Sequence, residues 1–153
     1  MAREFSSFGV LATHFRAVAD RLPHAIQDAL GESAELVEAT AKAGIAAHET
    51  PKGPYQGWGV RAGSPLIEKR GSGWAPCAPL LPTGELHDSI RREVEECVGG
   101  NVFQAVVGSK SPVMPCHEYG TSKMPGRPVL GQALFVNIEN SGKILIGRFQ
   151  KIF

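Results

Sequence analysis

The chain contains 153 residues, which is enough for one domain with a real core but not for a second sizeable one. Sixteen basic and fifteen acidic residues leave a net charge of +1, so charge does not indicate a surface that neutralises many nucleic-acid phosphates. Hydrophobic residues make up 42% and charged residues 20%, as in ordinary soluble globular proteins.

We expect neither a signal peptide nor a membrane-spanning segment. The first residues, Met1–Ser7, lack an apolar core long enough for a signal peptide, and no apolar run approaches the roughly 20 residues that span a bilayer. The three cysteines are widely spaced and form no CxxC pair: Cys77, Cys97 and Cys116. We therefore expect no membrane association and a reduced, cytosolic history rather than a disulfide framework.

Residues 8–48 have the pattern of a long amphipathic helix. Ser6 or Ser7 can cap its start, whereas Pro23 should kink it. A straight helix of this length would span about 60 Å, against a diameter of roughly 40 Å for a compact domain of this size. The pattern thus predicts either a break at Pro23 with folding back, or an overhang that packs on a neighbouring subunit. Apolar residues recur every three or four positions, at Leu11, Phe15, Val18, Leu22, Ile26, Leu30, Ala34, Val37, Ala41 and Ile45.

Residues 51–84 contain seven glycines and six prolines, so we expect no regular element there. A loop this long is typical of a binding loop or of a partly disordered insertion. Tyrosine and tryptophan are residues that anchor interfaces. The segment is therefore either a mobile insertion or a docking loop that uses Tyr55, Trp58 and Trp74.

Residues 86–98 favour a strand that follows a turn at Thr83-Gly84, with a helix as the alternative. Gly99–Asn101 is a turn signal. Residues 102–108 then have the composition of a short, mostly buried strand. Together the two strands predict a β-hairpin.

A final helix is expected to begin at Arg127-Pro128, because proline suits the first turn of a helix. Its apolar face comprises Leu130, Leu134, Ile138, Ser141, Leu145, Phe149 and Ile152. The order of elements predicts one α+β domain, residues 1–153, with a long Gly/Pro-rich loop at 51–84. In this domain the long N-terminal helix and the C-terminal helix pack on one face of a small antiparallel β-sheet.

Only one cluster in the sequence has residues suited to catalysis or metal binding. Cys116, His117 and Glu118 combine zinc-ligand and nucleophile types. On a strand, however, Cys116 and Glu118 would face one way and His117 the other. We therefore expect no enzyme, with no catalytic residue, cofactor or metal site. A basic cluster near the C-terminus is interpreted as a solvated face: Lys143, Arg148 and Lys151.

Two blocks of sequence resemble a known family. The first is LPTGELHDSI at residues 81–90, and the second runs from VGS at 107–109 through HEYGTSKMPGRPVL at 117–130 to AL at 133–134. Their order and spacing are similar to those of the neck and tail-completion proteins of long-tailed bacteriophages. The GWAP segment at 73–76 also resembles Mu-like virion morphogenesis proteins of the same broad group.

The motif residues have plausible structural roles. Thr83-Gly84 supplies a turn that directs Leu86 and Ile90 to the core, and Gly120 provides a turn with positive φ. Arg127 is expected to place its guanidinium on an acidic group of a neighbour, such as Glu118. The sequence departs from the family at two positions: Gly126 stands where alanine is usual, and Val129 where an aromatic is common.

The resemblance implies a structural virion protein, assembled in the host cytoplasm, that forms a sixfold ring at the head–tail junction. Its partners would be further copies of itself, the head-closure or connector protein, and the tail tube or tail-terminator protein. Double-stranded DNA would pass through the lumen without sequence recognition. The motif residues expected at the subunit interface are Gly84, Leu86, Ser89, Ile90, Glu118, Tyr119, Gly120, Thr121, Arg127 and Pro128.

Three alternative functions remain open at this point. One is a tail-terminator or minor tail subunit, which is the same kind of protein in another layer. Another is a small phage enzyme that uses Cys116 and His117. A third is a nucleic-acid-binding module that uses the basic C-terminus.

Overall fold

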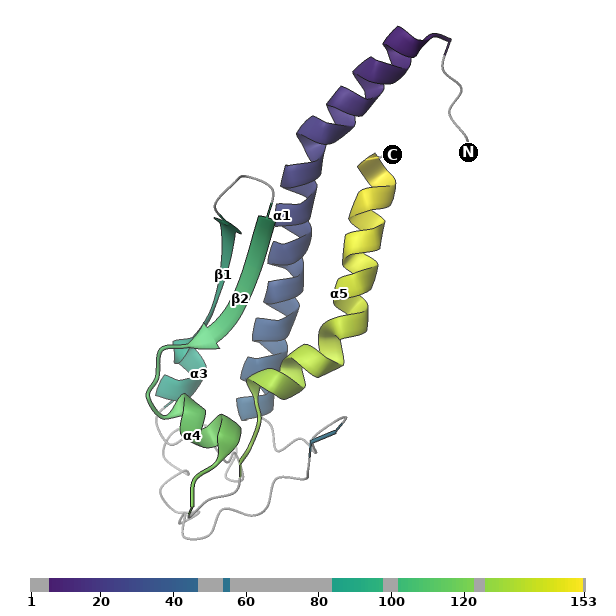
Figure 1. Ribbon diagram of the computed structural model, residues 1–153. Helices are drawn as coiled ribbons and strands as arrows, with labels where there is room; N and C mark the ends of the chain where they lie inside the picture. Colours follow the sequence, from purple (N-terminus) through teal and green to yellow (C-terminus); the bar gives the residue numbers. More distant parts are fainter. Residues whose placement is uncertain (1–5, 47–53, 56–83, 98–101, 123–125, 153) are drawn as a thin grey trace.

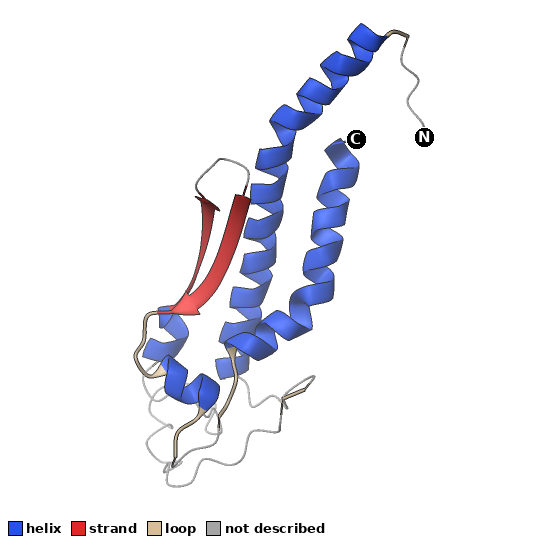
Figure 2. Cartoon of the chain, in the orientation of Figure 1, coloured by secondary structure: helices blue, strands red, loops and turns tan. Residues whose placement is uncertain are grey.

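The computed structural model describes residues 6–46, 54–55, 84–97, 102–122 and 126–152 (Figure 1). The fold is α+β, as expected, with a long N-terminal helix and a C-terminal helix packed with a two-stranded antiparallel sheet (Figure 2). The predicted loop at 51–84 lies outside the described residues except for Pro54, Tyr55 and Gly84. The elements in chain order are α1 (Phe8–Ala46), α3 (Glu85–Ser89), β1 (Ile90–Cys97), β2 (Val102–Ser109), α4 (Met114–Tyr119) and α5 (Leu130–Ile152).

Helix α1 is a single element of 39 residues that continues through Pro23. The Ser7 hydroxyl accepts a hydrogen bond from the backbone nitrogen of Val10 at 3.3 Å, which caps the start as predicted. Figure 1 shows a bend in the N-terminal half of α1, and this half projects beyond the end of α5. Folding back at Pro23 is therefore wrong, and the other expectation, an overhang, describes the helix.

The hairpin is confirmed, but the segment that precedes its first strand differs from the prediction. Residues 85–89 form the short helix α3, and β1 begins only at Ile90. The strands pair from Ile90 opposite Ser109 to Cys97 opposite Val102. The predicted turn at Gly99–Asn101 lies outside the described residues. Because side chains alternate along a strand, Arg92 and Val107 share the face that meets α1, whereas Glu93 and Val106 face away.

Helix α1 is the central element of the fold. The hairpin packs along one side of it and α5 along another (Figure 1). The core lies at the C-terminal end of α1, where α3, α4 and the start of α5 converge. Its buried residues are Val37, Ala41, Ile45, Leu86, Ile90, Met114, Val129 and Ala133. Burial of Val37, Ala41 and Ile45 confirms the C-terminal part of the predicted α1 stripe.

Helix α5 begins at Leu130, two residues after Pro128, and it turns a different face to α1 than expected. Leu134 and Ile138 are 57% and 61% exposed, so their predicted place in the core is wrong. Ala133 and Asn137 are buried instead. Asn137 can be buried because its side-chain nitrogen donates hydrogen bonds to the Thr40 hydroxyl at 2.8 Å and to the Ala133 carbonyl at 2.9 Å.

Candidate assembly surface and the motif residues

Glu118, at the end of α4, caps the start of α5. Its Oε2 accepts hydrogen bonds from the backbone nitrogens of Val129 at 2.8 Å and Leu130 at 3.1 Å. Its Oε1 accepts one from Gly131 at 2.8 Å. These are nitrogens that a helix start leaves without intrahelical partners, and a carboxylate there also interacts favourably with the helix dipole. Glu118 therefore acts within its own subunit.

Arg127 is among the largest fully buried side chains, at 2% exposure. Its backbone nitrogen donates to the His117 carbonyl, which ties the α4–α5 connection together. The expectation that its guanidinium lies on a neighbour's acidic group such as Glu118 is not met. Arg127 is enclosed by its own chain, and the described hydrogen bonds of the Glu118 carboxylate go to backbone nitrogens.

Two glycines fit the described parts of the connection that lie next to α4. Gly120 has φ 81°, in the left-handed region where residues with a side chain are strained, as the motif predicted. Gly126 approaches the end of α4 so closely that an added Cβ would lie 3.0 Å from the Tyr119 carbonyl carbon. The departure from alanine at this position thus has a steric reason.

The first motif block packs beside α4 and the start of α5, in the same core cluster. Gly84 has φ 80° and precedes α3, which confirms the predicted turn glycine. Leu86 and Ile90 are buried in the core. The Ser89 hydroxyl contacts the Leu86 carbonyl oxygen at 2.7 Å and the Ser109 hydroxyl at 2.6 Å, which joins α3 to the end of β2.

Part of the motif is accessible to a partner. Tyr119 is 85% exposed and Thr121 is also exposed, whereas Pro128 is half-buried. Of the predicted docking-loop residues, Tyr55 is half-buried and makes an edge-to-face contact with Phe135 of α5, at 6.4 Å between ring centroids. Trp58 and Trp74 lie outside the described residues. Tyr119 and Thr121 therefore form a small polar and aromatic surface near the place where the two motif blocks meet.

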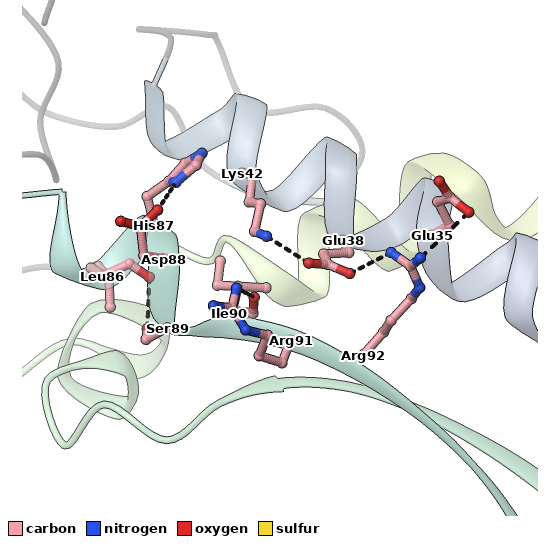
Figure 3. Close-up of polar contacts among 10 residues, drawn as sticks. All are labelled: Glu35, Glu38, Lys42, Leu86, His87, Asp88, Ser89, Ile90, Arg91 and Arg92. Carbon is pink, nitrogen blue, oxygen red and sulfur yellow. Dashed lines mark hydrogen bonds and ion pairs between the residues drawn. The ribbon is translucent and has the colours of Figure 1, made fainter.

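A charged cluster that the sequence reading missed joins β1 to α1 (Figure 3). Arg92 donates to the Glu38 carboxylate at 2.8 Å and lies 3.6 Å from that of Glu35. Lys42 also donates to Glu38, at 2.6 Å. The hydrogen bond from Lys42 lowers the pKa of Glu38; burial opposes this shift, and Arg92 adds to it. These contacts set the position of the hairpin on α1.

Cys116, His117 and Glu118 lie on helix α4, so the expectation of a strand is wrong. Their side chains nevertheless diverge. Cys116 is exposed, His117 is buried and Glu118 points to the start of α5. Within the described ranges, no group of three or more His, Cys, Asp or Glu side chains is placed to hold a metal ion.

The basic residues near the C-terminus are partly engaged within the chain. Arg148 donates to the Glu32 carboxylate of α1 at 3.0 Å and lies 3.9 Å from that of Asp28. Lys143 and Lys151 line a shallow depression beside this ion pair. The ion pair reduces the positive charge that this face offers to a phosphate backbone.

Two exposed apolar surfaces stand out on the helices. The first is the N-terminal overhang, residues 8–17 of α1, with Phe8 90% and Phe15 55% exposed. The second is the α5 outer patch, formed by Leu134, Phe135 and Ile138. Leu134 also borders an open groove of about 570 Å³ between β2 and α5, whose floor is α1. The floor residues are Leu30, Ser33, Ala34 and Val37.

Comparisons with known proteins add no relative. No protein-family model matches the chain, and no significant match is found among curated proteins or solved structures. Across the part of the chain that the structure describes, no helix is both long enough and apolar enough to span a bilayer.

Proposed function

We propose that the chain is a structural subunit of a bacteriophage virion that forms a ring at the head–tail junction and joins the tail to the DNA-filled head. The two motif blocks support the phage assignment. The observation that carries the assembly role is the pair of exposed apolar surfaces, the overhang and the α5 outer patch. Soluble monomers rarely leave several large apolar side chains exposed together, and such patches mark interaction sites.

The exposed motif residues Tyr119 and Thr121 support this role by forming a surface that a partner can contact. Glu118 and Gly120 set the path from α4 into α5, and Tyr119 projects from it into solvent. An exposed tyrosine beside a capped helix start suits a contact with the head-closure protein or the tail tube. The docking-loop role of Trp58 and Trp74 stays a prediction.

The test is deletion of the gene in the phage that encodes the chain, followed by negative-stain electron microscopy of lysates. We expect DNA-filled heads and separate tails of normal length. A plasmid copy of the gene should restore joined particles, which is the control for effects on neighbouring genes. Normal joining in the complete absence of the protein would contradict the proposal.

The same experiment separates the neck from the tail-terminator layer. Loss of a terminator releases tail growth, so tails of irregular and excessive length would favour that alternative. Tails of uniform length together with unjoined, filled heads favour the neck.

A further inference from the structure

The α1 side chains that pack on α5 belong to a stripe that continues along α1 beyond the end of α5. The two helices run antiparallel, because Asn137 bonds to Thr40 and Arg148 to Glu32. Helix α5 ends at Ile152, and by this register it ends beside the middle of α1. At 3.6 residues per turn, the residues of α1 in line with Thr40 are Ser33, Ala29, Leu22, Val18, Phe15, Leu11 and Phe8.

Exposure changes along this stripe. Ala29 and Val18 are buried, whereas Phe15 and Phe8 are increasingly exposed. The exposed side chains Phe8 and Phe15 therefore continue an established helix-packing surface. A helix face of this composition and spacing is suited to packing against another helix.

We propose that the overhang of one copy packs on the α5 outer patch and the adjoining groove of a second copy. Leu134 and Ile138 lie four residues apart on α5, so they offer a ridge on one face of that helix. This contact deepens the proposed ring function by naming the surfaces that join neighbouring subunits.

The overhang cannot reach the patch of its own chain. Asn137, next to Ile138, lies beside Thr40, which is about 25 residues from Phe15 along α1. At 1.5 Å per residue this is a separation of about 38 Å. The contact must therefore be intermolecular. Repeated in one direction, as the proposed ring requires, it is head-to-tail and closes into a ring or continues as a filament.

Charge favours this pairing over a pairing of two overhangs. Arg16 is the sole Lys, Arg, Asp or Glu in residues 8–17, and Glu139 is the sole one in residues 130–142. Arg16 follows Phe15, and Glu139 follows Ile138. Docking the overhang on the patch brings opposite charges together, whereas docking two antiparallel overhangs brings two arginines together.

The contact is small. A fully covered phenylalanine buries about 150–250 Å². Because Phe8 is 90% and Phe15 55% exposed, covering both buries about 300 Å² of the overhang. Stable interfaces bury about 800 Å² per partner. A single contact is therefore weak, and closure of a ring, in which every subunit makes two such contacts, provides the missing strength through avidity.

Site-directed cross-linking tests the proposal on the full chain with Cys77, Cys97 and Cys116 changed to Ser. One variant adds Ala12→Cys beside the overhang stripe, and another adds Ser141→Cys beside the patch. Each variant is purified. A short bismaleimide is then added to each variant alone and to a mixture of the two variants, with the protein at about 1 mM. Thermal melts establish that each variant folds.

We expect a cross-linked dimer chiefly in the mixture of the two variants. Thr13→Cys, on the opposite side of the overhang, is the matched control and should give at least tenfold less product with Ser141→Cys. Products from Ala12→Cys alone would overturn the proposal in favour of paired overhangs. Absence of product in every combination would also overturn it.

Exchanging the charges of Arg16 and Glu139 tests how the overhang aligns on the α5 outer patch. Arg16→Glu in the Ala12→Cys variant should lower the yield severalfold, and Glu139→Arg in the Ser141→Cys partner should restore it. Equal yields in all combinations would overturn the charge pairing. These experiments use purified protein, so their failure leaves the head–tail joining test standing and can be told apart from failure of the proposed function.

Discussion

The Glu118 carboxylate accepts a hydrogen bond from the backbone nitrogen of Gly131 at 2.8 Å, so the end of α4 caps the beginning of α5. In the connection between the two helices, Gly120 has positive φ and Gly126 lies against the Tyr119 backbone. The second motif block therefore defines a junction between helices, and its polar residues are used largely in building it.

Loss of the cap should destabilise the fold. Glu118→Ala is expected to lower the free energy of unfolding by about 0.5–2 kcal/mol, as for other helix caps. Glu118→Gln should cost less, because the amide oxygen still accepts one hydrogen bond. Urea denaturation measures both, with Glu95→Ala on the exposed face of β1 as the control, expected to change stability by less than about 0.5 kcal/mol. Equal stability of Glu118→Ala and the wild type would contradict the capping role.

Two glycines should respond to alanine in opposite directions. At Gly126 the added methyl meets the Tyr119 backbone at 3.0 Å, so Gly126→Ala should cost about 1–3 kcal/mol through overpacking. At Gly142, in the middle of α5, nothing lies within 4 Å of an added Cβ. Gly142→Ala should therefore stabilise by about 1 kcal/mol through helix propensity. Thermal melts of the two variants report the sign directly.

The buried and exposed faces can be distinguished by truncation. Ile45 is fully buried, and Ile45→Ala should cost about 2–5 kcal/mol by loss of burial and formation of a cavity. Leu134→Ala should change the stability of the isolated subunit by less than about 0.5 kcal/mol, because the side chain is mostly in solvent. A large loss at Leu134 would show that α5 turns its other face to α1.

Acid should weaken the attachment of the hairpin. The pKa of Glu38 lies below its usual value of 4.5 in the folded protein, mainly through the hydrogen bond from Lys42. A lowered folded-state pKa contributes stability that is present above the unfolded-state pKa and is lost as pH falls through the folded-state pKa. Wild-type stability should thus decline below about pH 4.5. Glu38→Gln, compared by urea denaturation between pH 7 and pH 3, should show a shallower decline.

Long periodic segments were predictable from the sequence, and short ones were not. The α1 stripe was readable because regular spacing over many turns leaves little ambiguity. Helix α3 has five residues and α4 has six, which is too short for a period, and α4 also contains Pro115. Their helical state depends on tertiary packing of Leu86 and Met114 in the core.

The buried face of α5 was predicted on the wrong side for a different reason. Hydrophobicity favoured Leu134 and Ile138 as core residues, but Asn137 is buried because it bonds to Thr40, 97 residues away in the sequence. The Arg92–Glu38 pair also joins residues far apart in the sequence, 54 positions from each other, and each residue alone resembles an ordinary surface charge. Among the motif residues, the turn glycines were predictable from their type, whereas the roles of Glu118 and Arg127 required the three-dimensional path of the chain.

The placement of the hairpin and α5 on separate sides of α1 has a consequence for how the subunit opens. Outside the core at the C-terminal end of α1, where Ile90 and Ala133 share one cluster, both elements are held mainly by α1 and make few direct contacts with each other. Either one can therefore detach while the other stays packed, so the molecule contains two local unfolding units that share one helix. Amide hydrogens in β1 and β2 should exchange in one cooperative step and those in α5 in another. The shared segment of α1, from Ala29 to Ile45, should exchange last, because exposing it requires both elements to leave.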